Sequence, residues 1–358
     1  MTTRPVERIL LPSRSLAPWA LLACALTLPA VLAACDSAGA GPADANSADS
    51  LDDTPAEDVR GGGGTYPESA TEAQIVALEA VNRYRIASGL APVNEVAALN
   101  QSAQAHADCL VSNCINYGTS GLSPHNEDPT WPGYTGTQFN DRMVAAGYSA
   151  AAMSEVIAFL DEPNRAVAGW IRTLYHRLPL LDPLTMEIGY GGANIGDGPP
   201  CNYHTYWNAD VIDIGMTLFA GDVVVLYPPD GSMYIPTSFD GLESPEPIRP
   251  LPNGWPSGTI VTVQYGKASI NPIKVKGHRL LEFGTTDVPH LIVAATADDA
   301  AGVLADPILS RENDHRTLAL YAYSRLKAGT DYTVVIDLER DGTPSHLEWS
   351  FKTDFTQD

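Results

Sequence analysis

The sequence predicts an α+β protein in which a three-layer α-β-α sandwich is followed by an all-β sandwich. In residues 67–220, apolar positions at helical spacing alternate with short apolar runs that are typical of buried strands. From Gly221 onward the apolar runs are short, rich in β-formers, and separated by Gly and Pro turns. We therefore place one folded segment at residues 67–220 and a second at residues 221–358.

The composition is that of a strongly acidic globular protein. The chain has 358 residues, 43 acidic and 21 basic side chains, and a formal net charge of -22. Binding to nucleic acid needs a basic face, so this balance argues against a nucleic-acid partner.

Residues 1–35 have the pattern of a bacterial lipoprotein signal peptide. Three arginines precede an apolar run from Leu16 to Ala34, and that run ends in small residues directly before Cys35. A basic region, an apolar region and small residues before the cut are typical of a secretory signal. The cysteine resembles that of a lipobox, so we expect Cys35 to be lipidated and to anchor the mature chain to a membrane. The alternative is a plain signal peptide with an incidental cysteine.

Residues 36–66 predict a disordered, acidic and Gly-rich tether. The segment is rich in Ala, Asp, Ser and Gly and ends near a run of four glycines. Nothing in it is periodic or apolar enough to fold. We therefore expect a protein of the cell envelope whose folded segments face the periplasm or the cell exterior on a flexible tether.

Stop and start signals divide the first folded segment into helices and strands. Thr71 opens a capping-box pattern, and Gly89 with Pro92 ends the helix that follows. Apolar spacing predicts a second helix from Leu99 to Leu110. Further helices are expected after Thr137, which would be the cap, up to Gly147 and from Pro163 to Leu174, with strands near residues 156–159, 188–193 and 203–216.

Five short motifs follow one another in this segment. They are Val81–Arg85, Ser123-Pro124-His125-Asn126, Ser154-Glu155, His176-Arg177 and Tyr206–Val211. Their order resembles the CAP superfamily (cysteine-rich secretory proteins, antigen 5 and pathogenesis-related proteins), especially its bacterial SCP-like branch. The resemblance implies the same α-β-α sandwich and a cleft built from two histidines and one or two acids.

By this resemblance, His125, Glu155 and His176 line the ligand cleft. Two imidazoles can bind Zn²⁺ or another divalent metal with support from a carboxylate, so His125 and His176 are the candidate metal ligands and zinc is the candidate cofactor. The resemblance also matches His106 to a histidine of the second helix, which we expect to pack in the interior. The sequence contains no His-Glu-x-x-His run.

The chain departs from the family pattern around the predicted cleft. Val156 follows Glu155 where asparagine is usual, and Thr173 stands where eukaryotic relatives have a glutamate. Leu174-Tyr175 replaces the usual turn before His176. The histidine pair is kept, but the full tetrad is not.

We expect the cleft to bind a lipid, a glycan or a peptide without catalysis. Nucleophilic hydrolysis needs an activated Ser or Cys, and no Gly-x-Ser-x-Gly elbow occurs. One alternative is a metal-dependent hydrolase or protease with Glu155 as its catalytic base. Another is a structural envelope or adhesion protein.

The cysteines of the folded part predict a disulfide. Cys109 and Cys114 are close enough for a local bridge, which an oxidising exported location would preserve. Cys201 would then be the odd thiol. The alternative is that Cys201 pairs with one of the first two.

The second folded segment predicts a β-sandwich that serves as a spacer or adhesion module. A strand at 223–226 leads into a Pro-Pro-Asp-Gly turn, and later β-rich runs cover 260–265, 280–283, 291–295 and 317–323. Asp341-Gly342 predicts a turn between the last two runs, Thr330–Ile336 and Leu347–Thr353, which resemble the final hairpin of bacterial Ig-like modules. The histidines of this segment show no ligand spacing and are expected at surface or packing positions: His278, His290, His315 and His346.

Overall fold

The computed structural model describes residues 63–196, 201–202, 204–218, 221–250, 252–266, 271–311 and 315–356. The predicted signal peptide, the predicted lipidation site Cys35 and nearly all of the predicted tether lie outside these residues, so they remain predictions. None of the helices within the described ranges has the length and apolar character needed to cross a membrane.

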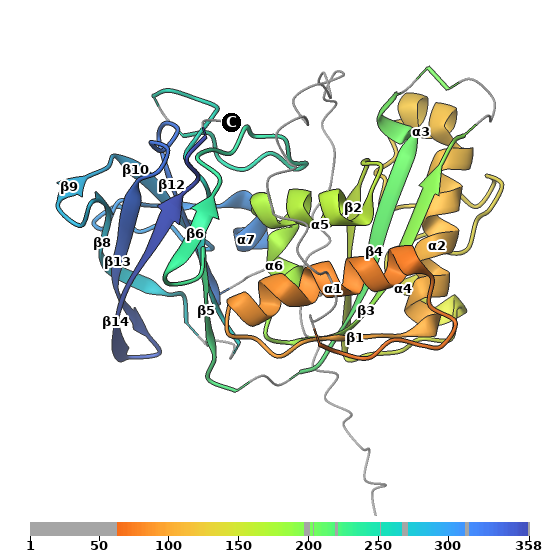
Figure 1. The fold of residues 1–358 in the computed structure, drawn as a ribbon, viewed down its shortest axis with the longest axis horizontal. Helices are drawn as coiled ribbons and strands as arrows, with labels where there is room; N and C mark the ends of the chain where they lie inside the picture. The colour runs from red at the N-terminus through yellow and green to blue at the C-terminus, as the bar shows by residue number, and fades with distance from the viewer. Residues whose placement is uncertain are drawn as a thin grey trace, which may run out of the picture.

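The first part of the chain is a four-stranded sheet with helices on both faces (Figure 1). Its elements are α1 (Glu72–Ala87), β1 (Asn94–Glu95), α2 (Ala97–Ser112), α3 (Cys114–Ser120), α4 (Phe139–Ala145), β2 (Ala152–Ala158), α5 (Pro163–Arg172), α6 (Arg177–Leu180), β3 (Thr185–Asn194) and β4 (Asn208–Met216). The strand order is β1-β3-β4-β2.

Alternate residues of the central strand β4 pack on opposite helical layers. Ile212 and Ile214 contact the cluster formed by α1 and α5, whereas Val211 belongs to the cluster formed with α2. This alternation follows from the two-residue period of a strand. Apolar side chains on both faces of one sheet therefore produce the predicted α-β-α sandwich, which the structure confirms.

The helix boundaries follow local signals with one exception. The capping box is present, because the Thr71 N–H donates to the Gln74 side chain at 2.8 Å and the Gln74 N–H donates to the Thr71 hydroxyl at 3.3 Å. Thr137 was expected to cap α4, and that expectation is wrong. The cap is Gln138, whose N–H donates to Asp141 at 3.1 Å, while the Thr137 hydroxyl lies 3.0 Å from the Tyr134 hydroxyl.

Two glycines let α2 lie directly on the sheet. A Cβ atom added to Gly189 would lie 2.2 Å from the Asn100 nitrogen, and one added to Gly191 would lie 2.2 Å from the Gln104 nitrogen. Only glycine permits so close an approach of two backbones. This contact fixes α2, and with it His106, against β3.

The second part contains two five-stranded sheets (Figure 1). Side chains from both sheets, such as Val263 and Val334, share one apolar core, so the sheets pack face to face. One sheet has the order β11-β10-β12-β7-β5, built from β5 (Val224–Tyr227), β7 (Val261–Tyr265), β10 (His290–Ala294), β11 (Val303–Ala305) and β12 (Thr317–Ala322). The other has the order β6-β14-β13-β8-β9, built from β6 (Ser232–Ile235), β8 (Lys274–Glu282), β9 (Thr286–Asp287), β13 (Asp331–Arg340) and β14 (Thr343–Thr353); α7 (Pro307–Arg311) precedes β12.

The final hairpin joins β13 and β14 as predicted. The two strands pair antiparallel from Asp331 with Lys352 to Arg340 with Thr343. Asp341 and Gly342 both have positive φ, 49° and 81°, which is what a tight two-residue hairpin turn requires. The β-rich character of this part is therefore confirmed, while its Ig-like classification and the boundary at residue 220 remain predictions.

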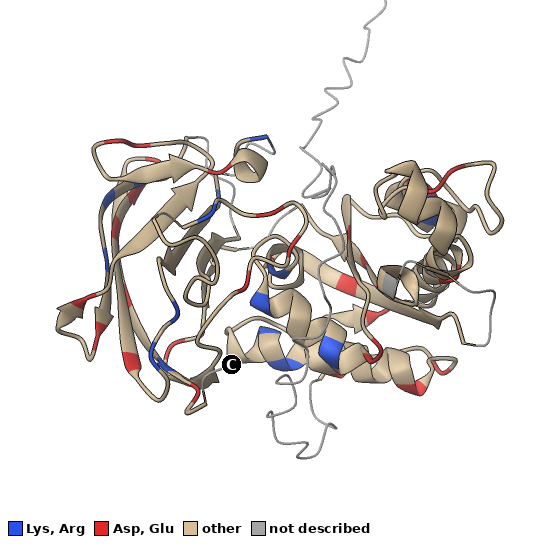
Figure 2. Ribbon diagram, turned by 90° about the horizontal axis from the view of Figure 1, so that it is seen from above, with Lys and Arg blue, Asp and Glu red and all other residues tan. Residues whose placement is uncertain are grey.

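The two parts are joined through the segment Leu174–Asp182. The Asp182 carboxylate, fully buried, accepts hydrogen bonds from Arg316 at 2.8 and 3.1 Å and from Gln264 at 3.2 Å. Apolar side chains of the same segment share a core with the second part: Leu174, Tyr175 and Leu178 with Phe239, Ile260, Leu291, Val293 and Tyr321. Figure 2 shows Asp and Glu residues over both parts of the described chain.

We predict that Arg316→Met destabilises the protein by about 3–5 kcal/mol, because it leaves the buried Asp182 carboxylate without its cation. The double variant Asp182→Asn/Arg316→Met should recover much of this loss. Urea unfolding measures the free energy of unfolding of the single and the double variant. The control is Arg325→Met, which removes a partly exposed pair with Asp240 and should change stability by less than about 1 kcal/mol. Equal losses for Arg316 and Arg325 would contradict the prediction.

Candidate functional site

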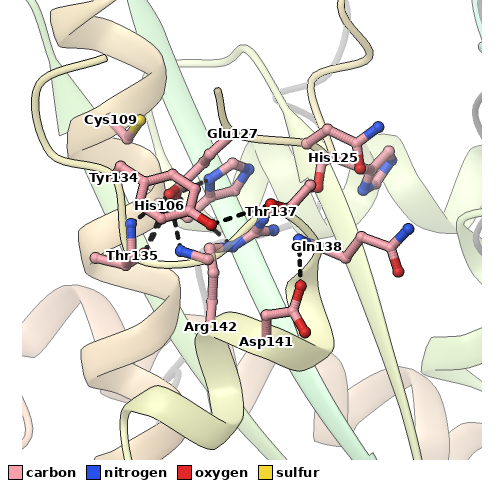
Figure 3. A network of polar contacts seen from close by, with 12 residues as sticks. His106, Cys109, His125, Glu127, Tyr134, Thr135, Thr137, Gln138, Asp141 and Arg142 are labelled. Atoms are coloured by element: carbon pink, nitrogen blue, oxygen red, sulfur yellow. Dashed lines mark hydrogen bonds and ion pairs between the residues drawn. The ribbon is translucent and has the colours of Figure 1, made fainter. Parts of the chain in front are cut away.

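A buried network of charged side chains lies between α2, β2 and α4 (Figure 3). The Arg142 guanidinium donates to Glu155 at 2.5 Å and to the backbone carbonyl of His125 at 3.1 Å. The Nδ1 atom of His125 lies 2.8 Å from the other Glu155 oxygen. The predicted pair of His125 and Glu155 therefore meets directly, and Arg142 completes it.

A second carboxylate, Glu127, organises the loop that carries His125. It accepts from the N–H groups of Thr135 at 2.6 Å and Gly136 at 3.3 Å, and it lies 2.8 Å from Nδ1 of His106 (Figure 3). The other ring nitrogen of His106 lies 2.8 Å from the Pro124 carbonyl. Both acceptors are satisfied only by the doubly protonated ring, and burial opposes that form by lowering the pKa of His106. His106 packs in the interior and ties the loop to α2.

The charge of Glu155 is held by its neighbours. Burial alone would raise its pKa, but Arg142 and His106 outweigh burial and hold the pKa of Glu155 well below its usual range. Asp213 stands directly opposite Glu155 on β4. Burial, together with the Glu155 charge, raises the pKa of Asp213 well above its usual range. The two shifts therefore run in opposite directions: the neighbours of Glu155 favour its charged form, and the surroundings of Asp213 favour its neutral form.

His176, the second predicted histidine, is bound by a residue of the second part. Its Nδ1 atom lies 2.8 Å from Glu243, and the same carboxylate accepts the backbone N–H groups of residues 174, 175 and 176 at 2.8, 2.6 and 3.0 Å. Glu243 follows His176 by 67 residues, so no local pattern marks it. The Thr173 hydroxyl is 3.5 Å from the His176 ring.

The structure divides the predicted cleft residues into two contact groups. His125 and Glu155 form one, and His176 with Glu243 forms the other; within the described part of the chain, no hydrogen bond or ion pair joins His176 to the first group. In each group a carboxylate holds Nδ1 of the histidine, which leaves Nε2 as the outer nitrogen. That orientation fits a metal ligand. The described residues nevertheless include no group of three or more His, Cys, Asp or Glu placed to hold a metal ion.

The predicted disulfide between Cys109 and Cys114 is wrong. The structure joins Cys114 to Cys201, the alternative pairing, and leaves Cys109 as a buried free thiol. Cys109 lies near the end of α2 and its sulfur faces the Pro132 carbonyl at 3.9 Å, whereas Cys114 begins α3. The Asn113 side chain, at the junction of the two helices, lies 3.5 Å from the Cys109 sulfur. The bridge from Cys114 ties α3 to the segment before β4.

One family model matches most of the first part of the chain. The model of the Cysteine-rich secretory protein family, CAP, matches residues 78–207, which run from within α1 to the residue before β4. This match supports a CAP domain in that range. A search of curated proteins found no match.

Two solved structures are similar over part of their length. One is an extracellular protein containing an SCP domain from Bacillus anthracis, with 19% identity and a TM-score of 0.27. The similarity covers 40% of this chain and 40% of that one. The other is an outer surface protein from Borrelia burgdorferi, with 20% identity and a TM-score of 0.29 over 40% of this chain and 90% of that one.

We predict that Glu155→Gln destabilises the protein by about 3–5 kcal/mol, because Arg142 would lose its buried partner. Asp213→Asn is the matched control one strand away. Because the surroundings of Asp213 favour its neutral form, the amide should change stability by less than about 1 kcal/mol. Urea unfolding near neutral pH compares the two variants. A larger loss for Asp213→Asn than for Glu155→Gln would reverse the assignment of the charge.

Proposed function

We propose that this is an extracytoplasmic, lipid-anchored CAP-domain protein that binds a ligand without chemical turnover. The anchor is proposed from the sequence pattern at Cys35, and the CAP domain from the family match. The observation that supports binding over catalysis is the state of Glu155. Its side chain is fully buried, paired with Arg142 and in contact with Nδ1 of His125.

A catalytic base needs access to substrate and a pKa near the working pH. Glu155 meets neither condition, because both carboxylate oxygens are engaged and its pKa is held well below the usual range. A water or substrate proton would have to displace Arg142 or His125 to reach it. The geometry therefore disfavours a hydrolase in which Glu155 is the base.

The ligand would meet the outer edges of the two histidines. The His125 and His176 side chains are 11% and 14% exposed, whereas Glu155 and Glu243 are fully buried. An imidazole edge offers a directional polar contact and little apolar area. Among the ligand classes that the sequence leaves open, we therefore favour the hydroxyl groups of a glycan or the amides of a peptide over a lipid chain.

A divalent metal such as zinc is a further proposal at these histidines. The carboxylate-bound Nδ1 atoms support it, since they fix each ring with Nε2 outward. When bound, the ion would supply a Lewis-acidic contact for the ligand. In zinc titration calorimetry, the variant His125→Ala/His176→Ala should bind one zinc ion fewer per chain than the unmodified protein. An unchanged count would remove the metal from the proposal.

The second part would serve as more than a spacer. Glu243 reaches His176, and Asp306 accepts the Tyr175 hydroxyl at 2.8 Å. Both contacts support the segment that carries the second histidine. We propose that the β-rich part stabilises one edge of the binding site.

Binding and turnover assays test the proposed function. We expect saturable binding to a member of a glycan or peptide panel, no hydrolysis of that ligand, and binding about tenfold weaker in His125→Ala. Hydrolysis that is lost in Glu155→Gln and kept in Asp213→Asn would establish the hydrolase instead. If the protein shows no binding and no hydrolysis, the structural alternative is supported instead. Circular dichroism confirms that each variant is folded.

A further inference from the structure

Two histidines of the β-rich part face one another across the sandwich. His278 lies on β8 of one sheet and His290 begins β10 of the other. The Nδ1 atom of His278 is 2.8 Å from Nε2 of His290, and the rings are close to perpendicular at 76°. Both side chains are partly buried. Their spacing in the sequence shows no ligand pattern and predicted only surface or packing roles.

The outer ring nitrogens fix where the protons are. His278 Nε2 lies 2.9 Å from the Ala301 carbonyl, and His290 Nδ1 lies 2.6 Å from the Val288 carbonyl. A carbonyl oxygen can only accept, so each outer nitrogen carries a hydrogen. The two inner nitrogens of the neutral rings then face each other with lone pairs. That contact is repulsive unless a cation lies between them.

We propose that His278 and His290 form a binding site for a borderline divalent cation such as Zn²⁺. The bound ion would link the two sheets. Imidazole suits zinc, copper and nickel, and ligand histidines in metal sites usually donate their other N–H to a carbonyl or carboxylate. Both rings already have this orientation. The site lies in the β-rich part and does not rest on the proposed function of the CAP domain.

The geometry needs only a small adjustment to hold the ion. Zinc–nitrogen bonds of about 2.0–2.1 Å at a tetrahedral angle place the two nitrogens about 3.3 Å apart. The rings, now at 2.8 Å, must therefore separate by about 0.5 Å. The described residues supply no third His, Cys, Asp or Glu ligand, so water would complete the coordination.

Neighbouring charges are compatible with a cation at this position. Burial lowers the pKa of His290 more than its contact with the Val288 carbonyl raises it, which favours the neutral ring that binds metal. Asp287, close to His290, adds negative potential, although its carboxylate is bound by Arg279 at 2.9 and 3.0 Å. A proton is the competitor for the same lone pairs.

Zinc titration calorimetry on the purified full chain tests the site near neutral pH. We expect His278→Gln and His290→Gln each to lower the affinity for one zinc equivalent by more than about tenfold. The control is His346→Gln, which changes an exposed histidine beside Asp337 and should leave the count unchanged. His125→Ala/His176→Ala should keep this equivalent, which separates it from any site in the CAP domain. Zinc should also raise the melting temperature of the unmodified protein and of the control.

Zinc binding that is unaffected by both His278→Gln and His290→Gln would overturn the proposal. Nitrogen NMR of the unmodified protein provides a test that needs no variant. We expect zinc to shift His278 Nδ1 and His290 Nε2 and to remove any proton shared between them. A shared proton that persists at saturating zinc would show that the pair binds a proton only.

Discussion

The buried ion pair between Asp182 and Arg316 is the constraint on which the arrangement of the molecule depends. A buried carboxylate is tolerated only when its partners are all in place. Asp182 meets Arg316 and Gln264 from the β-rich part, and its own backbone carbonyl accepts from Arg85 of α1 at 3.1 Å. One residue thus links the first helix, the turn before β3 and the second part. Displacing either part would expose Asp182 and Arg316 to solvent or leave one of them buried without its partner.

The same segment connects this constraint to the candidate site. His176 lies six residues before Asp182 in the chain, and Glu243 of the second part binds both its ring and its backbone. In the CAP pattern that the sequence resembles, eukaryotic relatives have a glutamate at the position of Thr173. Here a carboxylate from outside the residues that the family model matches contacts the histidine. The second histidine is therefore positioned by two parts of the chain, and the first by one.

Local sequence signals predicted the local structure, while contacts between distant segments escaped them. The capping box at Thr71 and the Asp341-Gly342 turn were readable because the partners lie within a few residues. The predicted meeting of His125 with Glu155 came from resemblance to a family. Glu243 at His176 was not predicted, and a bridge from Cys201 to Cys109 or Cys114 was only the alternative, since both contacts depend on how the segments fold back on one another. Periodicity reports which face of an element is buried, but not which element covers it.

The two histidine contacts of the candidate cleft share one physical consequence. Glu155 holds Nδ1 of His125 and Glu243 holds Nδ1 of His176, so both rings present Nε2 in a fixed tautomer. A fixed donor or acceptor loses little entropy when a ligand binds, which improves affinity. The same contacts occupy the carboxylates that a hydrolytic mechanism would need free. Under the proposed function, the contacts that orient the two histidines for a ligand also keep Glu155 from acting as a base.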